Sequence, residues 1–285
     1  MNTLALAIVL FSAVLHATWN LLAKRTRGGA TFVWLYDVVS VVIYAPLALY
    51  LIAVQHSSLS ITGLIFIVGS AILHLFYFVL LQRGYRSGDL SLVYPLARGT
   101  GPLLSTTLAI VLLGERPTAI ALVGVALIVA GVFVITGGIR VFKGGNIRWA
   151  LLYGMLTGLF IAAYTLWDKQ AVSAFLISPA IFYYSSIVVR MALLSPYAWL
   201  HRENVYQEWR SYRFEAVGVA ILSPLSYFLV LYVLVFTPVS YVAPAREVGV
   251  LFGTIMGIRL LAEGESRRRL IAAGMILLGI IALAI

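Results

Sequence analysis

Five charged residues stand well inside long apolar stretches of this 285-residue chain, and they are the side chains best placed to do chemistry. They are Asp37, Arg98, Arg190, Arg246 and Glu247. If the stretches lie in lipid, each charge costs about 2.5–3.5 kcal/mol unless it is paired, so five cost on the order of 15 kcal/mol. Pairing or a wet cavity must offset that cost, and guanidinium groups held there bind carboxylate or phosphate through two hydrogen bonds.

Two of the arginines follow a proline near the start of an apolar stretch. Arg98 comes three residues after Pro95, and Arg246 two residues after Pro244. Counted from the predicted helix starts, they lie about 9 Å and 7.5 Å deep. They would thus be about 13 Å apart across the middle of a core about 30 Å thick, with Arg190 near its centre. An anion would meet cations on either side of the middle; the alternative is that Arg98 and Arg246 snorkel to the headgroups.

The two acids need cationic partners. Glu247 points about 100° away from its neighbour Arg246 on a helix, so we expect it to pair with another cation such as Arg190. Asp37 could pair with any of the three arginines.

Other polar and aromatic side chains occur at similar depths. His16 and His74 are imidazoles whose ordinary pKa suits proton coupling, although a structural hydrogen bond explains each of them as well. Asp37 is a third candidate for carrying a proton. For the aromatic residues, an interfacial or lipid-facing role is an equal alternative. The side chains that could shape a substrate pocket are Trp19, Asn20, Tyr77, Tyr94, Tyr164 and Tyr227.

Composition shows which elements must position these residues. The chain is 62% hydrophobic and 11% charged, whereas soluble domains are near 45–50% and 25%, so soluble enzymes and disordered proteins are excluded. The apolar runs are continuous, which favours helices over a membrane barrel. The predicted spans are residues 4–22, 32–53, 61–81, 92–113, 119–136, 149–167, 180–200, 216–236, 241–261 and 270–285, with residues 201–215 as the longest connection.

Most of the net charge of +10 comes from residues between the spans. Basic residues concentrate in the odd-numbered connections, whereas the even-numbered ones hold only Arg116 and Lys169. The charges therefore predict topology, with odd connections in the cytoplasm and both termini outside, and no nucleic-acid partner. No cysteine is present and the four histidines are scattered, so no metal site or cofactor is expected. No HExxH, GxSxG or P-loop motif indicates an enzyme.

The two halves of the chain look like copies. The run from Ser91 to Glu115 is repeated, with one residue lost, from Ser240 to Glu263. Residues 1–139 and 147–285 are therefore predicted to be two five-helix repeats. Because five is odd, consecutive copies must be inverted in the membrane, as in many secondary transporters.

This pattern resembles the drug/metabolite transporter superfamily, in its ten-span branch with two EamA domains. The resemblance covers the whole chain and is carried by residues 95–118, the helix from Gly124 to Gly131 and their counterparts in the second half. It implies an all-α membrane protein whose spans one to four and six to nine line a cavity, and which exports or exchanges a small metabolite without ATP hydrolysis. It also implies cytoplasmic termini, opposite to the charge pattern. The short multidrug relatives carry a glutamate in the first span; this chain has His16 there instead, which disfavours export of aromatic cations.

Two further features concern packing. Glu115 and Glu263, at the ends of spans four and nine, are expected to cap loops and hold the following helix. Small residues recur every seven positions at 124 and 131, and again at 272 and 279, which permits close helix packing. They could join spans five and ten within the chain or in a homodimer.

Together these patterns predict a secondary transporter in the inner membrane of a bacterium. Its substrate would be a small anionic or zwitterionic metabolite such as an amino acid, an organophosphate or a phosphonate, moved by alternating access. A flippase for a phosphate-bearing lipid is the nearest alternative. A membrane subunit without transport activity and a membrane-embedded enzyme are the alternatives from other classes.

Overall fold

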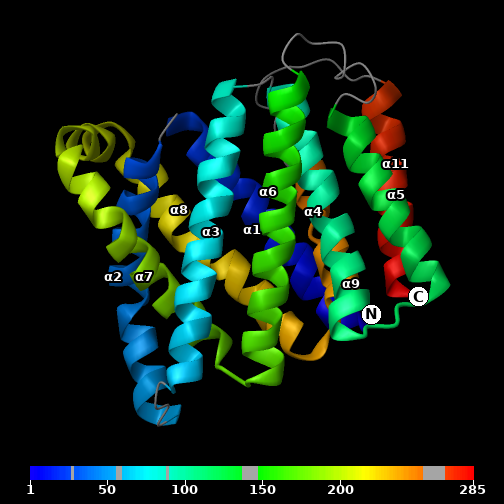
Figure 1. The fold of residues 1–285 in the computed structure, drawn as a ribbon, viewed down its shortest axis with the longest axis horizontal. Helices are drawn as coiled ribbons and strands as arrows, with labels where there is room; N and C mark the ends of the chain where they lie inside the picture. Colours follow the sequence, from blue (N-terminus) through cyan, green and yellow to red (C-terminus); the bar gives the residue numbers. More distant parts are fainter. Residues whose placement is uncertain (27–28, 56–59, 88–89, 137–146, 253–266) are drawn as a thin grey trace. The chain divides into compact units, whose positions relative to one another are not determined.

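The computed structural model describes residues 1–26, 29–55, 60–87, 90–136, 147–252 and 267–285. Within these ranges every regular element is helical (Figure 1). The elements are α1 (Thr3–Thr26), α2 (Ala30–Gln55), α3 (Ile61–Ser87), α4 (Leu90–Leu113), α5 (Ala119–Thr136), α6 (Ile147–Lys169), the π-helical η2 (Gln170–Ala174), α7 (Pro179–Leu200), α8 (Arg202–Phe236), α9 (Val239–Ala245) and α11 (Arg267–Ala284).

Most of these helices suit a membrane. Six contain stretches long and apolar enough to cross one: Thr3–Ala23, Ala30–Val54, Ile61–Leu81, Leu96–Leu113, Leu151–Ala174 and Arg202–Phe236. Two shorter apolar helices, Ala119–Val134 and Leu270–Ala284, correspond to spans five and ten. The predicted all-helical membrane fold is confirmed.

The chain forms two compact units. One comprises residues 1–13, 73–166 and 236–285, and the other comprises residues 14–72 and 167–235. Inside each unit, helices at corresponding positions of the two halves pack together: α2 against α7 in the second unit, and α4 against α9 and α5 against α11 in the first (Figure 1). This pairing is the arrangement expected of two repeats of five helices.

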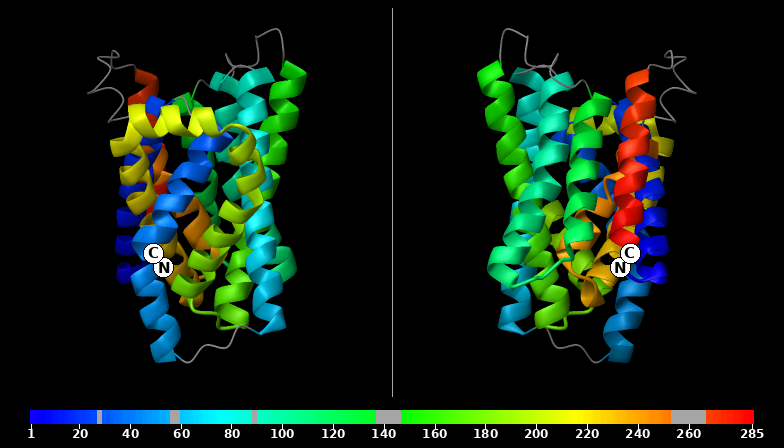
Figure 2. Two further views of the ribbon diagram at one scale, coloured as in Figure 1. Left: turned by 90° about the vertical axis from the view of Figure 1, so that its left-hand side faces the viewer. Right: turned by 90° about the vertical axis from the view of Figure 1, so that its right-hand side faces the viewer.

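The two chain ends meet within the first unit. The N-terminal ammonium of Met1 donates a 3.1 Å hydrogen bond to the carbonyl of Leu283 in α11 (Figure 2). Both ends therefore lie on one side of this unit, as an even number of spans requires.

The α5–α11 contact uses the small residues noted in the sequence. A Cβ at Gly279 would lie 2.7 Å from the Gly124 carbonyl oxygen and 2.6 Å from Cγ1 of Ile128, so the backbones approach too closely for any side chain. Gly131 faces Ala272 and Ile276 in the same way. These glycine faces are thus occupied within the chain. A homodimer through spans five and ten stays a prediction, and it would use the other faces of α5 and α11.

The predicted loop at residues 201–215 is wrong, because this segment is helical. It forms the first part of α8, which bends at Tyr212, where φ is −131° and ψ is 28°. Figure 2 shows this yellow segment turned across the direction of the rest of α8. Val205 and Tyr212 pack on a cluster that includes Phe32 and Val219. Burial of these two side chains gives the short polar segment a reason to stay helical.

The prediction that Lys169 lies in a connection is also wrong. Helix α6 runs to Lys169 and continues into the π-helical turn η2. The ammonium of Lys169 donates a 2.6 Å hydrogen bond to the carbonyl of Leu234 near the end of α8. Because that bond satisfies the ammonium, the apolar span extends farther than its charge suggested.

We expect Gly279→Ala to destabilise the protein by about 1–3 kcal/mol, because the added methyl group forces α5 and α11 apart. Gly274→Ala is the matched control, because Gly274 also lies on α11 and a Cβ added there would have no neighbouring atom within 4 Å. The measurement is the thermal unfolding midpoint of each purified variant in detergent. Equal midpoints for the two variants would show that this close contact is absent.

Candidate functional site

The ninth predicted span is not one continuous helix. Helix α9 ends at Ala245, Arg246 and Glu247 form a turn, and helical structure resumes at residues 248–252. Pro244, two residues before the turn, has no N–H to donate to the carbonyl of Ser240, so the short helix already lacks one of its own hydrogen bonds there. At this turn, backbone N–H groups donate to the carbonyl three residues earlier, as in a 3₁₀-helix, and not four residues earlier. The Glu247 N–H donates to the Pro244 carbonyl at 3.0 Å, and the Val250 N–H donates to the Glu247 carbonyl at 2.9 Å.

This turn carries a buried carboxylate facing an arginine of α4. Glu247 Oε2 lies 3.3 Å from Arg98 Nε, and the two side chains are 6% and 14% exposed. Arg246 also acts electrostatically on the Glu247 carboxylate. Guanidinium groups of both Arg98 and Arg246 therefore lie near this acid, within one compact unit.

These contacts revise two sequence expectations. Glu247 pairs with Arg98 and not with Arg190, because α4 and α9 pack together where α9 is broken. Arg98 is also brought to the level of the Arg246–Glu247 turn. The expected 13 Å separation of the arginines assumed two unbroken helices counted from opposite ends. Because Arg98 turns inward to Glu247, it does not snorkel.

Glu115 reaches the other end of α9. Its Oε1 and Oε2 accept the backbone N–H groups of Val239 at 2.7 Å and Ser240 at 2.9 Å. These are the first N–H groups of the helix, which have no partner within it. Glu115 thus holds α9 of the second half, and the expectation that it holds the following helix is wrong. Glu263 lies outside the described residues.

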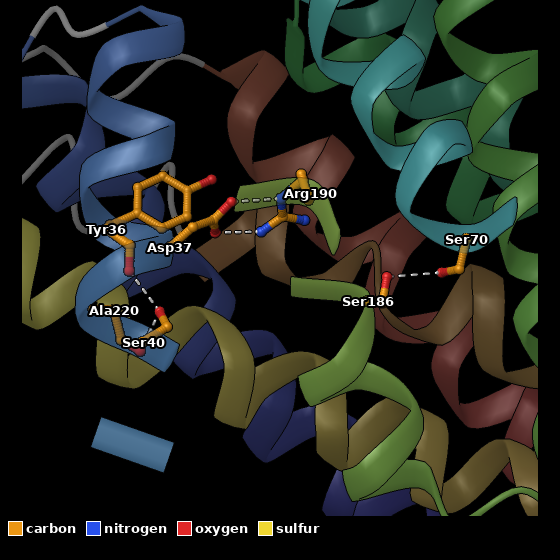
Figure 3. Close-up of polar contacts among 7 residues, drawn as sticks. All are labelled: Tyr36, Asp37, Ser40, Ser70, Ser186, Arg190 and Ala220. Carbon is orange, nitrogen blue, oxygen red and sulfur yellow. Dashed lines mark hydrogen bonds and ion pairs between the residues drawn. The ribbon is translucent and has the colours of Figure 1, made fainter. Parts of the chain in front are cut away.

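The second unit contains a closed ion pair. Arg190 of α7 donates two hydrogen bonds to Asp37 of α2, from Nε to Oδ2 at 2.8 Å and from Nη2 to Oδ1 at 2.6 Å (Figure 3). Beside it, the buried Ser40 hydroxyl donates to the Ala220 carbonyl at 3.0 Å. Both oxygens of Asp37 are engaged by Arg190. This geometry favours a structural role for the pair over substrate binding by Arg190 or proton coupling by Asp37.

Three of the predicted pocket and coupling residues gather in the first unit. The imidazole of His74 stacks on the ring of Tyr164, with centroids 4.1 Å apart. Tyr77 meets the same ring edge-on at 5.7 Å. His74 and Tyr164 are buried, so this cluster places an imidazole away from bulk water.

The predicted residues of α1 lie in the second unit. His16 and Trp19 make an edge-on contact at 4.9 Å, and the amide of Asn20 donates to the carbonyl of His16 at 2.8 Å. The indole N–H of Trp19 is buried and donates to no group in the part of the chain that the structure describes. Trp19 can therefore still donate to a ligand. The side chain of Tyr94 is outside the described residues.

One buried acid escaped the sequence analysis. Asp168, in the last turn of α6, is 0% exposed, and its Oδ2 accepts a 2.6 Å hydrogen bond from the hydroxyl of the predicted pocket residue Tyr227. Asp168 lies one residue beyond the predicted span 149–167 and is followed by Lys169, so the sequence indicates a connection at this position. A carboxylate next to a lysine, just past an apolar run, was the available signal.

Comparison with known proteins decides the family. Residues 3–137 and 148–285 each match the EamA-like transporter family. The chain belongs to the EamA-like transporter family. A crystal structure described only as that of a protein matches the EamA-like chain with a TM-score of 0.76 at 14% sequence identity. That match covers 99% of this chain and 98% of the other, and at such identity it shows the fold alone. The comparison with curated proteins found no match.

Family membership confirms several expectations. The EamA-like chain is a multi-pass integral membrane protein of the drug/metabolite transporter superfamily, and its two matched segments are consistent with two repeats of five helices. The family is one of transporters. The roles of individual residues remain predictions.

We expect Asp37→Ala to destabilise the protein by about 3–5 kcal/mol, because it leaves the buried guanidinium of Arg190 without its counter-charge. The double variant Asp37→Leu/Arg190→Leu should be more stable than Asp37→Ala. Ser186→Ala, on the helix that carries Arg190, is the control, since its hydroxyl makes a long 3.4 Å contact with Ser70. The measurement is unfolding in detergent by denaturant. A double variant as unstable as the single one would contradict the pairing.

We expect Glu115→Ala to destabilise the protein by about 0.5–2 kcal/mol, since two backbone N–H groups of α9 lose their acceptor. Glu115→Gln keeps one acceptor oxygen and should fall between wild type and Glu115→Ala. Glu203→Ala, at an exposed position of α8, serves as the control. Thermal midpoints in detergent measure the effect, and a Glu115→Ala midpoint equal to wild type would rule out the cap.

Proposed function

We propose that this chain is a secondary transporter of a small anionic or zwitterionic metabolite, such as an amino acid, an organophosphate or a phosphonate. The observation that carries the proposal is the pair of arginines sharing one buried carboxylate at the break in α9. Two guanidinium groups held near this carboxylate in an apolar surrounding favour an anionic ligand, because guanidinium binds carboxylate or phosphate through paired hydrogen bonds.

The contrast between the two buried acid–arginine pairs supports this choice. Asp37 and Arg190 form two hydrogen bonds at 2.6 and 2.8 Å. The Arg98–Glu247 contact is 3.3 Å long, and Glu247 Oε2 accepts no hydrogen bond from the described residues. A buried oxygen with unused acceptor capacity is costly unless a ligand or water supplies a donor. The first pair therefore suits a permanent role, and the second an exchangeable one.

A zwitterion would match this arrangement at both of its ends. Its carboxylate or phosphate would bind Arg98 and Arg246, for which planar guanidinium groups are well shaped. Its ammonium would donate to Glu247 Oε2. An anion without an ammonium would instead replace Glu247 beside the arginines.

In the proposed transport cycle, one five-helix repeat moves against the other so that the binding site opens to each side of the membrane in turn. The protein would export its substrate or exchange it for another. The break at Arg246 and Glu247 supports this cycle, because interrupted helices that carry binding groups are common in secondary transporters. The proposed location is the inner membrane of a bacterium. The basic odd-numbered connections place its cytoplasmic side.

The test is substrate counterflow in proteoliposomes, with labelled amino acids, organophosphates and phosphonates offered in turn. We expect Arg98→Ala and Arg246→Ala each to weaken the apparent affinity by about ten- to hundredfold, since each removes a hydrogen bond to a charged group. Arg202→Ala, exposed at the start of α8, is the control. Wild-type counterflow of any anion that both variants leave unchanged would refute the arginine site.

Glu247→Gln separates the two substrate classes, because it removes the charge while keeping the shape of the side chain. Zwitterions should bind more weakly to this variant, since their ammonium loses its counter-charge. Simple anions should bind more tightly, because no internal carboxylate competes for the arginines. The measurement is the concentration for half-maximal counterflow of each class.

A further inference from the structure

A line of ionisable side chains runs through the second unit. It starts at Asp168 in α6, whose Oδ2 accepts the hydroxyl of Tyr227 from α8 at 2.6 Å. The ring of Tyr227 packs on Tyr183 of α7, with centroids 4.7 Å apart. The Tyr183 hydroxyl interacts electrostatically with Asp168 and with the Asp37–Arg190 pair. Four helices thus contribute to one buried polar path.

The two carboxylates of this path differ in their partners. Asp37 is held by two guanidinium N–H groups, so its protonation would strip a buried cation of its counter-charge. The bond to Asp168 comes from a phenol, which is neutral. A phenol can donate to a carboxylate and, more weakly, to the carbonyl oxygen of a protonated carboxyl group. Asp168 can therefore gain and lose a proton while keeping this partner.

The backbone beside Asp168 has an unusual form. The π-helical turn Gln170–Ala174 begins two residues later. This turn ends α6, because the chain leaves the helix after Ala174. In this chain the turn follows the one buried acid that α6 contributes to the described structure.

We propose that Asp168 is the proton-carrying carboxylate of this protein, and that its protonation couples transport to the proton gradient. This inference rests on the proposed function and extends it to a residue of the second unit. One proton from water binds a carboxylate oxygen, the side chain becomes neutral, and the same proton leaves to water on the other side. Its loading weakens the charge-assisted bond from Tyr227 and so loosens α6 from α8.

The described charged and titratable groups around this path are few. They are Tyr227 on α8, Tyr183 and Arg190 on α7, Tyr36 and Asp37 on α2, and Lys169 on α6 itself. The Lys169 ammonium donates to the Leu234 carbonyl. A metal cation would need several oxygen ligands, and the neighbouring cations Lys169 and Arg190 oppose it.

The first experiment measures substrate accumulation in proteoliposomes driven by a pH gradient or by a sodium gradient. Wild-type protein should accumulate substrate only with the pH gradient. With Asp168→Asn, the substrate should reach the same concentration inside and outside the vesicles. This variant should still catalyse counterflow, because counterflow needs no net proton movement. Asp168→Glu should restore accumulation, and Glu203→Gln, an exposed acid on α8, should behave as wild type. Loss of counterflow in wild type itself would refute the proposed function.

Several outcomes would overturn the coupling role while leaving the proposed function intact. They are wild-type counterflow without a response to pH, accumulation driven by sodium, and unchanged pH-driven accumulation in Asp168→Asn.

The second experiment requires no substrate. Infrared difference spectra of the purified protein between acidic and alkaline pH should contain the C=O band of a protonated carboxyl group. That band should be missing in Asp168→Asn, shifted in Tyr227→Phe and unchanged in Glu203→Gln. A band that persists in a folded Asp168→Asn protein would show that another carboxyl group takes up the proton.

Discussion

A charge inside an apolar helix bundle must find its counter-charge within the protein, and this requirement organises the buried interior described above. Asp37 and Arg190 satisfy it completely, because each donor of the guanidinium edge meets a carboxylate oxygen. Arg98 and Glu247 meet more loosely, at 3.3 Å, with Arg246 beside them in the turn. The tighter pair joins α2 to α7, and the looser group is where binding is expected.

The sequence was sufficient for the architecture. Continuous apolar runs identified the helices, and the repeated Ser91–Glu115 and Ser240–Glu263 segments identified the two halves that the family comparison then matched. It was also sufficient to select the buried charges Asp37, Arg190 and Glu247, because hydropathy marks an isolated charge inside an apolar run clearly. Small residues at 124 and 279 correctly indicated a close helix contact, which the structure places inside the chain.

What the sequence could not supply was the pairing among those charges and the true ends of the helices. Glu247 meets Arg98 because α4 packs against α9 where α9 ends, and a depth count along an ideal helix cannot include that end. Asp168 was missed for a related reason, since Lys169 looked like the end of a span. Its ammonium is satisfied by the Leu234 carbonyl, a contact between residues 65 positions apart that no local pattern reports.

The cap on α9 and the charged turn at its other end have a consequence for any attempt to divide this protein. Glu115 and Arg98 come from the first half of the chain, whereas α9, Arg246 and Glu247 come from the second. Neither half alone contains the finished arrangement. A gene split between the repeats would have to produce both polypeptides in the same cell, and each would remain inactive until it met the other.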